Sequence, residues 1–179
     1  MSQTAQQREI NEDRMHEFLG KVVGDFGAGL SSVLGYIGQK LGLYEALAGS
    51  DGLTSEELAA KTGTKERYVR EWLLNQASGG YVHFDPATKK YSMLPEQAVA
   101  LTDMNSPFYV GGGFYVIKAM MNAQPRIADA FVNGGGLLWG DNDPDLFIGT
   151  ERFFRPGYTA HLVGEWLPAL TGIVERLNA

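Results

Sequence analysis

The stretch LTSEELAAKTGTKERYVREWLL, residues 53–74, decides the fold class. Thr54 is followed three residues later by Glu57, which forms a capping box: the hydroxyl and the carboxylate each satisfy a backbone N–H at a helix start. Gly63 is placed to end this helix, and Thr64 is placed to cap the next one. The pattern therefore predicts two helices separated by a tight turn, as in a helix-turn-helix.

The residues that follow the two helices alternate in polarity. After a pair of glycines, the sequence YVHFDPATKKYSML (81–94) places two short runs of strand-forming residues on either side of an Asp85-Pro86 turn. Helix, turn, helix and hairpin together make a winged helix. We expect a mainly α-helical protein with a small β-hairpin wing and additional helices, in which the winged-helix domain spans residues 29–104.

The chain before this domain is predicted to be helical. Residues 1–28 begin polar and then show helical spacing, which indicates an N-terminal helical arm. In the segment LSSVLGYIGQKLGLYEAL (30–47), apolar residues recur at helical spacing with Gly35, Gly38 and Gly42 between them. A glycine inside a helix costs about 1 kcal/mol relative to alanine. We therefore expect another helix or chain to pack very close to this segment, which would be buried and could lie between subunits.

The region after the wing, residues 105–179, is rich in aromatic side chains and is predicted to be helical. Two interpretations are open: the rings form core, or some of them line a pocket for a flat or apolar small molecule. Arg152 and Arg155 would then help to orient the ligand. The side chains that we name as substrate-side candidates are Tyr115, Phe147, Phe153, Phe154, Tyr158 and His161.

The Arg155-Pro156 step bears on the shape of this region. Proline lacks an N–H and disfavours helix in the residue before it, so we expect a break near Arg155 and two short helices that form an aromatic lid. An unbroken helix would place Phe147, Phe154, Tyr158 and His161 on one face, because they are spaced by seven, four and three residues.

The charge of the chain argues against nucleic-acid binding. The formal net charge is −6, from 15 basic and 21 acidic residues, and the acidic excess extends into residues 50–104. The second helix of the pair carries Glu66 and Glu71, which would face phosphates. Phosphate neutralisation supplies nearly all non-specific affinity for DNA. We expect no nucleic-acid partner, although Lys89 and Lys90 on the hairpin keep open the alternative of a DNA-binding transcriptional regulator.

Other functional classes are excluded by composition. The sequence has no cysteine, so it has neither a disulfide framework nor a thiolate metal site. The N-terminus shows no apolar run behind a basic start, and no segment approaches the ~20 apolar residues of a membrane span. We expect a cytoplasmic protein that is not a membrane protein.

Three motifs suggest a ligand but lack essential parts. VVGDFGAGL (22–30) carries the acid and glycines of a nucleotide-binding turn without a long enough preceding strand, so we expect a glycine-bearing helix junction. The glycine triplets at 111–113 and 134–136 lack the Lys-Ser/Thr ending of a phosphate loop and are expected to be helix breaks or loop turns. DNDPDL (141–146) lacks the later glycine and glutamate of a calcium loop. It is expected to be a solvated loop that caps the following helix, and not a metal site.

Four stretches together carry a family resemblance: LGLYEALA (41–48), GLTSEELAAKTGTKERYVREWL (52–73), GGYVHFDPATKKYSML (79–94) and FFRPGYTAHLVGEWLPALTGIVERL (153–177). They resemble the N-terminal half of bacterial class I S-adenosylmethionine-dependent methyltransferases with a winged helix, relatives of small-molecule O-methyltransferases. The resemblance implies a homodimer that forms through the arm and the winged helix. It also implies that later helices cover the substrate side of the active site.

In that family, the helix that resembles GEWLPALTGIVERL (164–177) leads into the first strand of a Rossmann-like catalytic domain. The sequence ends before such a strand. We therefore expect the S-adenosylmethionine site and the catalytic base to lie outside this chain, which alone would bind no cofactor and would be inactive. A stand-alone helical protein that binds a small molecule remains a further alternative.

Overall fold

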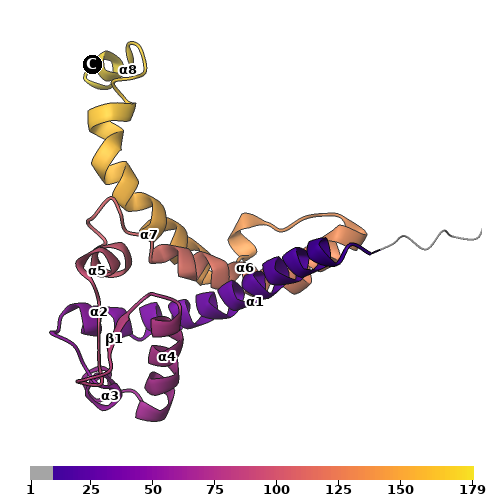
Figure 1. The fold of residues 1–179 in the computed structure, drawn as a ribbon. Coiled ribbons are helices and arrows are strands. Elements are labelled where there is room, and N and C mark those ends of the chain that lie inside the picture. The colour runs from indigo at the N-terminus through magenta and orange to yellow at the C-terminus, as the bar shows by residue number, and fades with distance from the viewer. Residues whose placement is uncertain (1–9) are drawn as a thin grey trace, which may run out of the picture.

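A computed structural model gives the fold of residues 10–179, which is mainly helical with one small hairpin (Figure 1). The first nine residues of the predicted arm lie outside the described residues. The helices are α1 (Glu12–Lys40), α2 (Leu43–Ala48), α3 (Ser55–Thr62), α4 (Glu66–Ser78), α5 (Pro95–Thr102), α6 (Gly112–Asn133), α7 (Pro144–His161) and α8 (Ile173–Leu177). The strands are β1 (His83–Asp85) and β2 (Lys90–Ser92), and two short turns are η1 (Trp139–Asp141) and η2 (Leu162–Trp166). The predicted fold class is confirmed, and residues 10–179 contain no Rossmann-like sheet.

The start of the helix-turn-helix follows the predicted chemistry. Thr54 and Glu57 form the capping box at the start of α3, and Gly63 ends that helix with a positive φ of 67°. The prediction that Thr64 caps α4 is wrong. The backbone N–H of Thr64 donates to the carbonyl of Ala59 and so closes the end of α3, and Lys65 stands at the N-cap of α4 without a side-chain hydrogen bond.

The wing is a two-stranded antiparallel hairpin, as predicted. Phe84 of β1 lies opposite Tyr91 of β2, and their rings pack with centroids 4.7 Å apart. The Asp85 carboxylate accepts hydrogen bonds from the backbone N–H of Ala87 and from the Thr88 hydroxyl, which fixes the turn. These bonds lower the pKa of Asp85, the Thr88 hydroxyl having the larger effect.

The core of the protein lies inside the winged helix. Tyr44 of α2 and Trp72 of α4 are buried and meet edge to face, with ring centroids 5.0 Å apart. The Tyr44 hydroxyl donates to the Gln76 side chain, and the Trp72 indole N–H donates to the carbonyl of Leu34 on α1 at 2.8 Å. The indole hydrogen bond therefore joins α1 to the winged helix.

Helix α1 is continuous where the sequence predicted a helix junction at residues 22–30. The junction prediction is wrong, because glycines weaken a helix without breaking its hydrogen bonds. The close packing predicted at Gly35 and Gly38 is confirmed within the chain. A Cβ at Gly35 would overlap the ring of Phe114, and a Cβ at Gly38 would overlap the rings of Tyr44 and Trp72.

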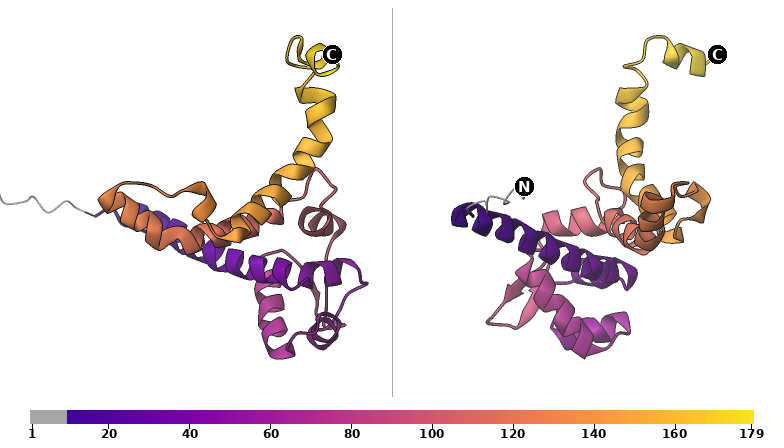
Figure 2. Two further views of the ribbon diagram at one scale, coloured as in Figure 1. Left: turned by 180° about the vertical axis from the view of Figure 1, so that it is seen from behind. Right: turned by 90° about the vertical axis from the view of Figure 1, so that its right-hand side faces the viewer.

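The last helices leave the winged-helix body. Helix α6 lies alongside α1, and α7 crosses α6 and then rises away from the body towards α8 and the C-terminus (Figures 1 and 2). The two glycine triplets behave as predicted: one begins α6, and the other forms a loop in which all three glycines have positive φ. Within residues 10–179, no helix combines the length and the apolar character needed to cross a membrane.

Candidate functional site

The start of α7 is fixed by a polar cluster that joins three helices. Asp143 caps α7 by accepting a hydrogen bond from the backbone N–H of Asp145. Lys118 of α6 places its Nζ 2.8 Å from Asp143 Oδ2 and 2.7 Å from Asp145 Oδ2. The Tyr36 hydroxyl of α1 donates to Asp145 at 2.7 Å, and the Asn122 amide donates to Asp143 at 2.7 Å. The capping role predicted for this loop is confirmed.

The prediction that this loop is solvated is wrong at these two aspartates. Asp145 is buried, and the Asp143 side chain is only 18% exposed. The hydrogen bond from Lys118 lowers the pKa of Asp143 to about 2. Burial opposes ionisation of Asp145, but hydrogen bonds from Lys118 and Tyr36 outweigh it and lower its pKa. The hydrogen bonds from Lys118 to Asp143 and Asp145 raise the pKa of Lys118, so the cluster is ionised at neutral pH.

Helix α7 is unbroken from Pro144 to His161, so the predicted break near Arg155 is wrong. Proline removes one backbone hydrogen bond, but Pro156 is itself buried and contributes apolar packing, and the first half of α7 is held against α6. A similar proline, Pro125, lies inside α6. The two-helix lid is therefore replaced by one helix that projects beyond the body.

The projecting half of α7 carries a row of rings that contact one another. The ring centroids of Phe153 and Phe154 lie 5.2 Å apart, those of Phe154 and Tyr158 6.5 Å apart, and those of Tyr158 and Trp166 5.5 Å apart. His161 stacks on Trp166 at 5.9 Å. We call these five residues the aromatic row.

The aromatic row is not part of a core. Phe154 is 53% exposed and Tyr158 is 51% exposed. A shallow hollow of about 400 Å³ lies along this surface, and it is lined by Thr150, Glu151, Phe154, Arg155 and Tyr158. Arg155 lies 3.1 Å from Glu151 in an exposed ion pair. A ligand or domain on this surface would contact aromatic faces, the Tyr158 hydroxyl and the ion pair of Glu151 and Arg155.

The other predicted site residues lie elsewhere. Phe147 sits at the start of α7, where its ring meets Trp139 edge to face at 5.3 Å. Tyr115 is buried against Tyr36, and the Arg152 guanidinium lies over its ring at 4.9 Å. The structure therefore brings together Phe153, Phe154, Tyr158 and His161, and separates Phe147 and Tyr115 from them.

His161 occupies a distinctive position at the end of α7. Its Nδ1 atom is buried without a hydrogen bond in the described part of the chain and lies 3.1 Å from Glu165 Oε1. The helix then widens into the π-turn η2, which brings Trp166 onto the imidazole. Trp166 is not one of the six substrate-side candidates named from the sequence.

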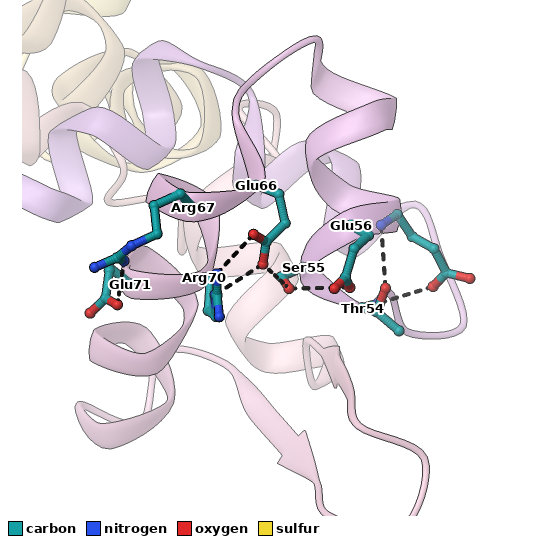
Figure 3. Close-up of polar contacts among 8 residues, drawn as sticks. Thr54, Ser55, Glu56, Glu66, Arg67, Arg70 and Glu71 are labelled. Carbon is teal, nitrogen blue, oxygen red and sulfur yellow. Dashed lines mark hydrogen bonds and ion pairs between the residues drawn. The ribbon is translucent and has the colours of Figure 1, made fainter.

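Helix α4 is the helix that would enter the major groove of DNA, and its arginines form ion pairs with glutamates of the same helix (Figure 3). On α4, Arg67 pairs with Glu71, and Arg70 pairs with Glu66 at 3.1 Å. Glu66 also accepts a hydrogen bond from Ser55 of α3 at 2.8 Å. Both arginines of α4 therefore already have a carboxylate partner, and a phosphate would have to compete with it.

No group of three or more His, Asp or Glu side chains in residues 10–179 is arranged to hold a metal ion. The glycines of the nucleotide-like motif lie inside α1, so they do not form a turn between a strand and a helix. The motif at residues 22–30 thus does not form a dinucleotide-binding turn.

Comparison with known proteins identifies the winged helix. Residues 29–103 match the family model of the Rv2258c-like winged HTH domain. The structure of the mitomycin 7-O-methyltransferase MmcR is similar, with a TM-score of 0.62 and 18% sequence identity over 84% of this chain and 47% of that chain. This chain therefore spans about half the length of that protein, and the likeness is one of fold. No curated protein matches the sequence.

Proposed function

We propose that this chain, whose residues 29–103 match the model of the Rv2258c-like winged HTH domain, is the N-terminal part of a methyltransferase that uses S-adenosylmethionine and acts on a small molecule. The fold likeness to a methyltransferase about twice as long supports this proposal. The observation that carries it is the aromatic row, which projects beyond the winged-helix body and is half exposed at Phe154 and Tyr158.

The proposed role of the aromatic row is to contact the substrate. Contiguous apolar surface on a soluble protein marks a site that a ligand or another domain covers. The faces of Phe154 and Tyr158 suit a flat apolar substrate, and the Tyr158 hydroxyl can orient it by a hydrogen bond. The paired charges of Glu151 and Arg155 would border the same surface.

The chemistry of methyl transfer would come from elsewhere in the enzyme. The reaction needs a substrate heteroatom in line with the methyl group of the cofactor and usually a base to take the proton. Because residues 10–179 contain no Rossmann-like sheet, we propose that a Rossmann-like domain outside them supplies both. On this proposal the 179-residue chain alone is inactive.

The experiment that tests this proposal uses the complete open reading frame. The purified product is incubated with methyl-labelled S-adenosylmethionine and a panel of hydroxylated aromatic compounds, and transfer of label is measured. We expect transfer to at least one compound. In the Phe154→Ala and Tyr158→Ala variants, kcat/KM should fall by about 10-fold or more, because they remove substrate contacts.

The matched control is Phe108→Ala, which removes an exposed ring on the loop after α5 and should leave kcat/KM unchanged. A complete product that transfers no label to any compound would argue against the proposal. Equal activity of the Tyr158→Ala variant and the unaltered enzyme would show that the aromatic row serves another purpose.

A DNA-binding regulator is the main alternative, since winged helices commonly read DNA. The pairing of Arg67 with Glu71 and of Arg70 with Glu66 weighs against it. A protein of net charge −6 also lacks the positive field that steers proteins to DNA.

A further inference from the structure

A hollow opens between α1 and α6, and no residue of the aromatic row lines it. It has a volume of about 160 Å³ and lies beside the polar cluster that holds the start of α7. For comparison, an apolar cavity of about 150 Å³ in another protein binds benzene. The hollow therefore has room for a molecule with one six-membered ring.

Three apolar side chains from the two helices line the hollow. Val33 of α1 is 43% exposed, and Ile117 and Met121 of α6 are 38% and 46% exposed. A ring that covers these side chains would remove apolar surface from water, which is favourable. Methionine fills irregular gaps because its thioether side chain is flexible, so Met121 can adapt to the shape of a ligand.

The other side of the hollow is polar and belongs to the cluster at the start of α7. Tyr36, Lys118 and Asn122 line it, and each of them donates a hydrogen bond to Asp143 or Asp145. An ammonium has three N–H donors, and Lys118 uses two of them for the two aspartates. Within residues 10–179 the third donor remains available, as do the carbonyl and the second N–H of Asn122. The hollow can therefore donate to and accept from one polar group of a ligand.

The charges of the cluster determine which polar group fits. Lys118 is ionised and already lies between two carboxylates. A ligand carboxylate would lie near Asp143 and Asp145, and a ligand ammonium would lie beside the ammonium of Lys118. Either ion would also lose water without gaining an unpaired counter-ion. A neutral hydroxyl avoids both costs, so the hollow favours a neutral ligand.

We propose that the hollow between α1 and α6 binds a small neutral molecule with one aromatic ring and a hydroxyl group. The ring would lie against Val33, Ile117 and Met121, and the hydroxyl would accept from Lys118 and donate to the Asn122 carbonyl. A bound ligand would thus bridge α1 and α6 beside the ion cluster that holds α7. This inference concerns binding and does not depend on methyl transfer.

The first test uses methyl NMR, because the three apolar residues of the hollow all carry methyl groups. The probe is benzyl alcohol, and the chain is labelled at the methyl groups of valine, isoleucine and methionine. Ring currents of the bound probe should shift the signals of Val33, Ile117 and Met121, with a Kd on the order of 1 mM for a molecule of this size. If none of the three signals moves at about 20 mM probe, the proposal is wrong.

Two neighbouring methionines of α6 provide matched variants. Met121 lines the hollow, whereas Met120 is 43% exposed and does not line it. Both side chains are about half exposed, so both variants should fold. Met121→Trp fills the hollow with an indole and should raise the Kd for benzyl alcohol by about 10-fold or more, while Met120→Trp should leave it unchanged. Equal affinities of the two variants would place the probe elsewhere and overturn the proposal.

A third measurement tests the preference for a neutral group. Benzoate and benzylammonium have the ring of benzyl alcohol, but at neutral pH they carry a negative and a positive charge. We expect each ion to bind about 10-fold more weakly than the alcohol, or weaker still. An ion that binds as tightly as benzyl alcohol would show that Lys118 and Asn122 do not select the ligand, and it would overturn the assignment of a neutral hydroxyl compound.

Discussion

Lys118 of α6 holds Asp145 at the start of α7, with Nζ 2.7 Å from Oδ2. The same ammonium lies 2.8 Å from Asp143, and Tyr36 of α1 donates to Asp145. Lys118 therefore joins α7 to α6, and the Tyr36 hydroxyl joins α7 to α1. The direction in which α7 leaves the body depends on this cluster as well as on apolar packing.

We predict that Lys118→Met destabilises the chain by about 2 kcal/mol, because it leaves two mostly covered carboxylates without their cation. Urea unfolding followed by circular dichroism measures the change. The control is Lys21→Met, which breaks an exposed pair with Asp25 and should cost about 0.5 kcal/mol or less. Equal losses in the two variants would show that the cluster contributes no more than a surface ion pair.

The cluster also predicts how stability depends on pH. The folded pKa of Asp143 is about 2, below the value of about 3.9 for an unfolded aspartate. Its contribution is therefore present at neutral pH and is lost as the pH falls from about 4 to about 2. The difference in unfolding free energy between the unaltered chain and Asp143→Asn should shrink across that interval. A difference that stays constant down to pH 2 would contradict the lowered pKa.

We predict that the rings of the aromatic row matter little for folding. Tyr158 and Phe154 are about half exposed, so replacing either by alanine should cost about 1 kcal/mol or less. Trp72 is 3% exposed in the core, and Trp72→Ala should cost about 3–5 kcal/mol. Thermal unfolding of the three variants compares these losses. A large loss for Tyr158→Ala would assign that ring to the core.

We expect the chain not to bind duplex DNA at low salt, because the arginines of α4 already pair with carboxylates. A gel-shift titration with random-sequence duplex tests this. The double variant Glu66→Gln/Glu71→Gln releases Arg67 and Arg70 and should gain weak binding that disappears as salt is raised. Binding by the unaltered chain that is stronger for one sequence than for others would favour the regulator.

We also expect no binding of S-adenosylmethionine to the 179-residue chain, since the glycines of the nucleotide-like motif lie inside a helix. Isothermal titration calorimetry with the cofactor measures this directly. A micromolar affinity that is lost in Asp25→Ala would show that residues 22–30 bind the cofactor after all.

Local chemistry could be predicted from the sequence where a few neighbouring residues determine it. The capping box at Thr54 and the hairpin turn at Asp85 depend on atoms within four residues, and both are present. The break expected at Pro156 depends on a local preference of proline, and this preference does not interrupt α7, which continues to His161.

The candidate site was predictable only in part, for a similar reason. The spacing of Phe154, Tyr158 and His161 predicts a shared face once the helix is unbroken. Tyr115 is buried where its ring meets Tyr36 and Arg152, which both lie far away in sequence. The ion cluster joins Lys118 to Asp143 and Asp145, and no periodic pattern connects residues so far apart.

The close contact between α6 and α7 at Gly112 and Gly149 determines the direction of the rest of α7. A Cβ at Gly149 would lie 2.8 Å from the carbonyl oxygen of Gly112 and 2.7 Å from Cβ of Tyr115, so backbone rests almost directly on backbone. From this point to His161 the helix extends for about 18 Å, at 1.5 Å per residue. A methyl group added at Gly149 would tilt the part of α7 that follows it. The displacement of the helix at His161 would be several times larger than at the crossing. Gly149, which bears no side chain, therefore affects where the aromatic row lies.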